Sequence, residues 1–331
     1  MSIRLYFGPA DWERIERDYA AWWAHALDRP LVQITEKVLD PAVAYPEEVA
    51  FTSNYPWEWS AEEAIAAITP HLEAMRYHGD AFPRWWPNFG PGVMAAFLGA
   101  RAHSVPETVW FSPDVPREAC DIHLCYAPDN AWWRRVRDVT RAAVGAWEGL
   151  VQVAHTDLGG NLDVVASFRT TEALLTDLYD APEEVERLAG EVTRLWLRYY
   201  DELGALIAGA CRGATCWAPI WSAGPGYMLQ SDLSYMISPE MFARFVVPDL
   251  VACCARLDHA FYHLDGRGQI AHLDQLLAIE RLRGMQWIPG DGAPPPEAWL
   301  DLLARIVGAG KLCQVYVTAE GARRIVRALG G

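Results

Sequence analysis

The sequence predicts an α/β protein built as a TIM (β/α)8 barrel with an N-terminal helical extension. Three observations support this prediction. From about residue 136 onward, apolar strands alternate with helices of ten or more residues, a pattern typical of parallel strands joined by right-handed crossovers. The chain has 331 residues, a length at which α/β barrels often form one domain. Apolar residues make up 52% of it, enough to fill a large core.

We therefore expect one barrel domain over residues 1–331, with residues 1–80 as the helical extension packed on the barrel. Pro9 suits the first turn of the first helix, and Ser60, with Glu63 three residues later, predicts the capped start of another. Residues 81–135 read as irregular because proline and aromatic residues are frequent there. The expected helices cover 9–27, 60–77, 136–147, 171–208 with a break at 180–182, 238–257, 269–281, 295–308 and 319–329. The expected strands cover 31–36, 150–157, 214–221, 259–265, 284–289 and 311–317, with a glycine-rich loop reaching residue 237.

Composition excludes several classes of partner. The formal net charge of −15 argues against nucleic acid and anionic membranes, which are bound by basic surfaces. The charged N-terminal segment does not resemble a secretion signal, and no apolar stretch is long enough to span a bilayer. An odd count of seven cysteines in a chain of this length favours reduced thiols, so we expect a cytoplasmic protein.

The strongest candidate site lies at the end of the strand over 259–265. His263 and Asp265 are two residues apart, so both side chains should point to one face of the strand. Active sites of barrels lie at the carboxyl ends of the strands, and an imidazole beside a carboxylate can hold a divalent metal such as zinc. Cys313, on the last strand, is a candidate third ligand. The alternative is a buried pair that only orients the strand end.

Two further segments offer polar groups at strand ends. His155, Asp157 and Asn161 surround a Gly-Gly turn and are candidates for substrate binding, although such residues also stabilise turns through their own backbone. Asp232 and Tyr227, in the glycine-rich loop, are candidates for proton transfer or substrate anchoring. A helix-capping role is the alternative for Asp232.

Sixteen tryptophans are unusual for this length and have two interpretations. Trp221 and Trp287 lie near expected strand ends and could line a pocket, together with Asp291 in the loop after the second of these strands. Packing in the core explains most of the sixteen equally well.

Four segments resemble the uroporphyrinogen decarboxylase superfamily: LVQVAHTDLGGNLDVVASFR, SDLSYMISPEMFARFVVPDL, FYHLDGRG and MQWIPGDG. The resemblance implies a barrel and divides the possible chemistry between two branches. In the zinc-dependent corrinoid methyltransferases, His263 would match a zinc ligand, and Asp265 stands where that branch has a cysteine. The cofactor-free decarboxylases use an arginine-rich N-terminal motif that this chain lacks.

The leading hypothesis is a zinc-dependent methyltransferase that acts on a small molecule, with a corrinoid protein as a possible methyl carrier and an undetermined oligomeric state. Two alternatives stay open. One is a cofactor-free decarboxylase or other lyase that uses the same pocket. The other is a barrel that binds a small molecule without changing it.

Overall fold

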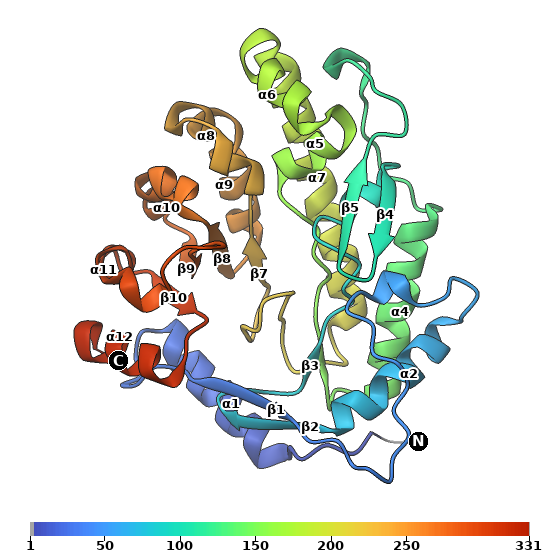
Figure 1. Ribbon diagram of the computed structural model, residues 1–331, viewed down its shortest axis with the longest axis vertical. Helices are drawn as coiled ribbons and strands as arrows, with labels where there is room; N and C mark the ends of the chain where they lie inside the picture. Colours follow the sequence, from blue (N-terminus) through green and yellow to red (C-terminus); the bar gives the residue numbers. More distant parts are fainter. Residues whose placement is uncertain (1–2, 331) are drawn as a thin grey trace.

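The computed structural model describes residues 3–330 and shows a mixed α/β fold with parallel sheets (Figure 1). The helices are α1 Pro9–Trp23, α2 Ala61–Glu73, α3 Met94–Phe97, α4 Ala131–Trp147, α5 Asn161–Arg169, α6 Thr171–Asp180, α7 Pro182–Ile207, α8 Pro239–Phe245, α9 Val247–Arg256, α10 Leu273–Ala278, α11 Leu300–Gly308 and α12 Ala319–Leu329. The strands are β1 Gln33–Lys37, β2 Met75–Gly79, β3 Arg84–Trp85, β4 Arg101–Val105, β5 Thr108–Ser112, β6 Gln152–Val153, β7 Gly226–Leu229, β8 His259–Asp265, β9 Leu282–Ile288 and β10 Leu312–Val315. Short 3-10 helices cover Thr52–Asn54, Ala119–Asp121, Asp232–Met236, Arg267–His272 and Pro296–Ala298.

Two parallel sheets form the centre of the fold. One has the order β10-β9-β8-β7, and the other pairs β3 with β6. Helices α8 to α12 lie outside the four-stranded sheet, as Figure 1 shows. The predicted alternation of strands and helices is therefore confirmed as an α/β arrangement with parallel pairing. Ladder hydrogen bonds among the described residues group these strands into two separate sheets.

The N-terminal segment contributes an antiparallel pair of strands, β1 and β2. β1 pairs antiparallel with β2, so the end of the helix predicted over 60–77 is a strand. The predicted cap is confirmed: the Ser60 hydroxyl accepts from the Glu63 amide at 3.1 Å, and the Glu63 carboxylate accepts from the Ser60 amide at 2.7 Å. Figure 1 places the β1–β2 pair between β10 and β3.

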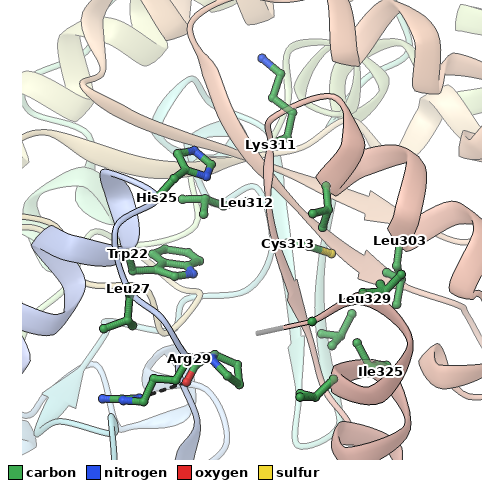
Figure 2. Close-up of a pocket in the computed structure, with 15 residues that line it drawn as sticks. Trp22, His25, Leu27, Arg29, Leu303, Lys311, Leu312, Cys313, Ile325 and Leu329 are labelled. Carbon is green, nitrogen blue, oxygen red and sulfur yellow. Dashed lines mark hydrogen bonds between the residues drawn. The ribbon is translucent and has the colours of Figure 1, made fainter.

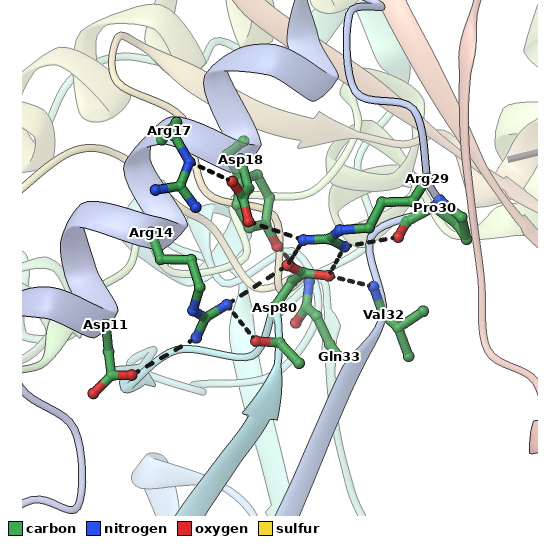
Figure 3. Close-up of polar contacts among 11 residues, drawn as sticks. Asp11, Arg14, Arg17, Asp18, Arg29, Pro30, Val32, Gln33 and Asp80 are labelled. Atoms are coloured by element: carbon green, nitrogen blue, oxygen red, sulfur yellow. Dashed lines mark hydrogen bonds and ion pairs between the residues drawn. The ribbon is translucent and has the colours of Figure 1, made fainter.

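An ion-pair cluster links the β1–β2 pair to α1 (Figure 3). The carboxylate of Asp80 is 1% exposed and accepts from the Arg29 guanidinium at 2.7 and 2.8 Å and from the Val32 amide at 2.7 Å. Arg29 also donates to Asp18 of α1 at 2.9 Å. The buried carboxylate of Asp80 has both a charged partner and a backbone donor. The cluster therefore joins the segment just before β1 to the residue just after β2.

Several predicted elements differ from the structure. Residues 214–221 were expected as a strand but contribute only an isolated bridge between Ala214 and Ser222, whereas the expected loop contains β7. The region over 81–135 was expected to be irregular but includes the antiparallel pair β4–β5. The helix predicted over 238–257 is divided between α8 and α9 at Val246, ahead of Pro248, which has no amide hydrogen to continue the ladder. Among the described helices, none combines the length and the apolarity needed to cross a lipid bilayer.

Asp249 of α9 contributes a buried carboxyl group to the contact with α7. The Thr193 hydroxyl donates to Asp249 Oδ1 at 2.6 Å. Burial raises the pKa of Asp249 to about 6, although the hydrogen bonds from Thr193 and Cys253 act in the opposite direction. The folded protein therefore retains a proton on this group at pH values where the unfolded chain has already lost it.

This difference predicts a pH-dependent stability change on Asp249→Asn. A raised acid pKa costs folding free energy, and the cost grows as pH rises from the unfolded-state pKa to the folded one. Relative to the wild type, we expect the variant to gain about 2 kcal/mol in free energy of unfolding between pH 4 and pH 7.5. Urea unfolding at both pH values measures the change. Asp129→Asn, at an exposed carboxylate, is the control, and an equal gain in both variants would contradict the assignment.

Candidate functional site

Three side chains of types that can ligate a metal meet at the carboxyl end of β8. His263 and Asp265 project from one face of this strand, and Asp232 comes from the 3-10 helix Asp232–Met236. One ligand atom from each of the three lies within 4.8 Å of the others. His263 Nε2 is 3.7 Å from Asp265 Oδ2. We call these three residues the His-Asp-Asp cluster.

The neighbouring strands orient His263. In the parallel register, His263 lies beside Gln286 of β9, and Gln286 lies beside Gln314 of β10. His263 Nδ1 forms a hydrogen bond with Gln286 Oε1, and Gln286 Nε2 donates to Gln314 Oε1 at 2.5 Å. Because the amide oxygen can only accept, Nδ1 carries a proton, so the neutral imidazole has its lone pair on Nε2, which faces the carboxylates.

Asp163 holds the loop that carries Asp232. Its carboxylate accepts from the backbone amide of Asp232 at 2.9 Å and from that of Leu233 at 2.7 Å. Gly160, at the start of α5, allows this approach, since a Cβ added there would lie 2.2 Å from the carbonyl oxygen of Gln230 and 2.6 Å from Asp163 Oδ2. The position of Asp232 therefore depends on a close backbone contact far from it in sequence.

We expect Gly160→Ala to displace this loop and weaken metal binding at the cluster. The clash is with backbone, so relief requires movement of the 230–233 segment, and the free energy of unfolding should fall by about 1–3 kcal/mol. Zinc titration and urea unfolding measure the two effects. Gly145→Ala is the matched control, because Gly145 lies on an exposed face of α4 with no atom within 4 Å of an added Cβ. That change should stabilise the helix by about 0.5–1 kcal/mol. Unchanged zinc affinity in Gly160→Ala would contradict the role assigned to the loop.

The carboxylates around the cluster are poised to bind protons near neutral pH. Burial raises the pKa of Asp157 to about 6 and, with the charge of Asp232, that of Asp163 to about 7. Asp232 is exposed on one side, but partial desolvation by the surrounding protein raises its pKa to about 6; His263 opposes the rise, and Asp157 and Asp265 add to it. Desolvation alone would lower the pKa of His263, but Asp265, Asp232 and Gln286 reverse the sign and raise it. Asp157 and the cluster are therefore electrostatically coupled: His263 lowers the pKa of Asp157, and Asp157 raises that of Asp232.

The donor set fits a catalytic zinc site. Such sites combine three nitrogen or oxygen ligands from the protein with an open fourth position. Tetrahedral bonds to zinc place ligand atoms about 3.3 Å apart, so the separation of 3.7 Å between His263 Nε2 and Asp265 Oδ2 requires only a small adjustment. Asp232 is exposed, so solvent reaches the cluster from that side.

Tyr227 and His155 lie away from the cluster. The Tyr227 hydroxyl donates to the Thr156 carbonyl at 3.0 Å and accepts from the Leu158 amide at 2.8 Å, so it holds backbone in place and is not free to exchange a proton. His155 is buried and stacks on Tyr200 of α7, with ring centroids 4.4 Å apart. Burial lowers the pKa of His155 to about 4, so the ring packs as a neutral group between sheet and helix.

Four other candidate residues also lie outside the cluster. Asn161 donates to the Phe245 carbonyl at 3.0 Å within the core. Trp221 packs against Tyr19 of α1, with ring centroids 6.1 Å apart. Trp287 follows the inward-facing Gln286 on β9 and so faces the other side of the strand. There it is fully buried and packs edge-on against Trp299. Asp291 is exposed in the loop after β9.

Cys313 is not a third ligand, which corrects the prediction. It alternates with Gln314 on β10, so it points to the opposite side of the strand from the residues that contact the cluster. Figure 2 shows its sulfur in a separate cavity of about 260 Å³, shared with Trp22, Leu303 and Leu329. Burial raises the pKa of the Cys313 thiol to about 12, which opposes thiolate formation. Asp232, which the sequence indicated as a proton-transfer candidate, is instead the third member of the cluster.

Sequence reasoning missed Gln286 and Gln314. Both occupy the inward-facing positions of strands that are otherwise rich in apolar side chains. A polar residue at such a position was the available signal, since an amide placed in a strand interior needs a partner. Trp217 also contacts the cluster, and its ring lies edge-on to His263 at 5.1 Å between centroids.

Fold and site together define an α/β protein with an imidazole–carboxylate cluster at the carboxyl ends of parallel strands. No family model and no curated protein sequence matches the chain. A solved structure of a methyltransferase from Methanosarcina mazei is similar over 95% of this chain and 97% of that one, with a TM-score of 0.57 and 12% sequence identity. The chain therefore shares the fold of that protein.

Proposed function

We propose that this protein is a metal-dependent methyltransferase that acts on a small molecule, with zinc at the His-Asp-Asp cluster. The observation that carries the proposal is the orientation of His263, whose Nδ1 is held by Gln286 so that Nε2 faces two carboxylates. The likeness in fold to the Methanosarcina mazei methyltransferase supports the type of reaction. The proposal includes a closed barrel of the uroporphyrinogen decarboxylase superfamily and a corrinoid protein as methyl carrier.

The residues of the chain divide the work between ligation and proton transfer. His263, Asp265 and Asp232 would hold the zinc, which when bound lowers the pKa of a coordinated thiol or hydroxyl group of the substrate. Asp157 is buried beside the cluster, and its pKa of about 6 suits it to take the proton that this group loses. Gln286 and Gln314 keep the imidazole in place during turnover.

Methyl transfer from methylcob(III)alamin tests the proposal. In the balanced reaction, the acceptor loses a proton, its sulfur or oxygen forms a bond to the methyl carbon, and the cobalt–carbon bond breaks to give cob(I)alamin. The assay is run without oxygen, with 2-mercaptoethanol or phenol as acceptor, and the absorbance of cob(I)alamin is followed. We expect transfer that requires zinc and is lost in His263→Ala. Zinc-independent transfer, or none with either acceptor, would count against the proposal.

A further inference from the structure

A second cavity of about 590 Å³ lies between the N-terminal segment and the parallel strands. Its walls come from β1, β2, α2, the 49–55 segment, β3 and the residue that follows β10. Aromatic rings make up much of the lining, contributed by Tyr55, Tyr77, Phe82, Trp85, Trp86 and Tyr316. The volume is in the range of small-molecule sites in proteins.

Arg84 of β3 brings a positive charge into this cavity without a carboxylate partner. Its Nη2 donates to the carbonyls of Cys216 at 2.8 Å and Trp217 at 2.7 Å, but its Nε is buried and has no hydrogen-bond partner. The titratable groups that act most strongly on Arg84 are thiol and phenol groups: Cys216, Tyr316, Tyr19 and Tyr77. A buried guanidinium without a counter-charge is costly, and an anion bound beside it removes that cost.

Other polar atoms around the cavity also lack partners. The Tyr77 hydroxyl is buried and unpaired, and so is His71 Nδ1, while His71 Nε2 bonds to the Pro46 carbonyl at 2.9 Å. Glu48 is the carboxylate among the described lining residues, and it is exposed and paired with Lys37. The interior of the cavity therefore offers one positive charge and a phenol donor against aromatic walls.

Tyr316 connects this cavity to the His-Asp-Asp cluster. It lines the cavity although it is 55% exposed; partial desolvation raises the pKa of its phenol, while Arg84 and the side chains of Gln314 and Gln286 act to lower it. Gln286 in turn bonds to His263. Tyr316, Gln286 and His263 therefore form a chain of neighbouring side chains from the cavity to the cluster.

We propose that this cavity binds a small aromatic monocarboxylate, with its carboxylate on Arg84 and Tyr77 and its ring against Trp85 and Trp86. One uncompensated guanidinium matches one negative charge, and the aromatic lining matches an aromatic body. The inference goes beyond the proposed function, because this cavity is separate from the cluster and binding there needs neither zinc nor a methyl donor.

Isothermal titration of the metal-free protein tests the inference with benzoate, benzyl alcohol, acetate and inorganic phosphate. We expect benzoate to bind about tenfold or more tightly than benzyl alcohol, which keeps the ring but lacks the charge, and than acetate, which lacks the ring. Benzyl alcohol binding as tightly as benzoate would overturn the role of the charge. Acetate or phosphate binding as tightly would overturn the aromatic monocarboxylate.

Two variants locate the binding. Arg84→Gln should weaken benzoate binding about tenfold or more, and Arg101→Gln, at an exposed arginine of β4, should leave it unchanged. Because Arg84 also holds two backbone carbonyls, its loss could unfold the protein. Tyr77→Phe, which removes only an unpaired hydroxyl, is therefore the second variant, with an expected loss of about threefold or more. Unchanged benzoate affinity in either folded variant would overturn the placement. Benzoate binding without methyl transfer would leave this inference standing and remove the proposed function alone.

Discussion

His263→Ala should remove stoichiometric zinc from the protein. The variant loses the nitrogen donor and leaves two carboxylates, one of them exposed, which cannot complete a tetrahedral site. We expect the zinc content after dialysis to fall from about one ion per chain to below about 0.1. Mass-spectrometric metal analysis of the purified proteins makes the measurement. His78→Ala, at an exposed imidazole, is the control and should retain the metal.

A graded variant separates ligation from orientation. Gln286→Leu leaves all three ligands in place but removes the acceptor that holds His263 Nδ1. Zinc affinity should fall about 10- to 100-fold, less than in His263→Ala, as is typical when the partner of a ligating histidine is lost. Full zinc retention in His263→Ala, or no effect in Gln286→Leu, would show that the metal binds elsewhere.

Phe97→Ala should cause a large loss of stability in the core. Phe97 ends α3, is fully buried and packs against Trp133 of α4 and Tyr199 of α7, with centroid separations of 5.2 and 5.1 Å. Removing the ring leaves a cavity between three elements that cannot easily close. The expected loss is about 3–5 kcal/mol in free energy of unfolding.

Urea unfolding of the wild type and the variant measures this loss as a shift of the midpoint at constant slope. Tyr179→Ala, at a ring that is 74% exposed on α6, should change the free energy of unfolding by less than about 0.5 kcal/mol. A loss below about 1 kcal/mol in Phe97→Ala would mean that α3 is not part of the cooperative core.

The sequence was most informative where structure depends on neighbours along the chain. The cap at Ser60 and the helix at Pro9 appear where they were predicted, because capping and proline effects act within one turn. His263 and Asp265 share a face because side chains on a strand alternate with period two. Residues 214–221 were wrongly predicted as a strand, because an apolar run does not reveal which segment pairs with its neighbours.

The sequence by itself determined the α/β class and one half of the candidate site. Only the tertiary structure decided that Asp232 completes the cluster, that Gln286 orients His263 and that Cys313 faces another cavity. The same holds for Arg84, whose missing counter-charge is visible only once the whole wall of its cavity is assembled. The reason is physical: periodicity fixes the face of one strand, whereas contacts between strands and loops depend on register and packing over the whole chain.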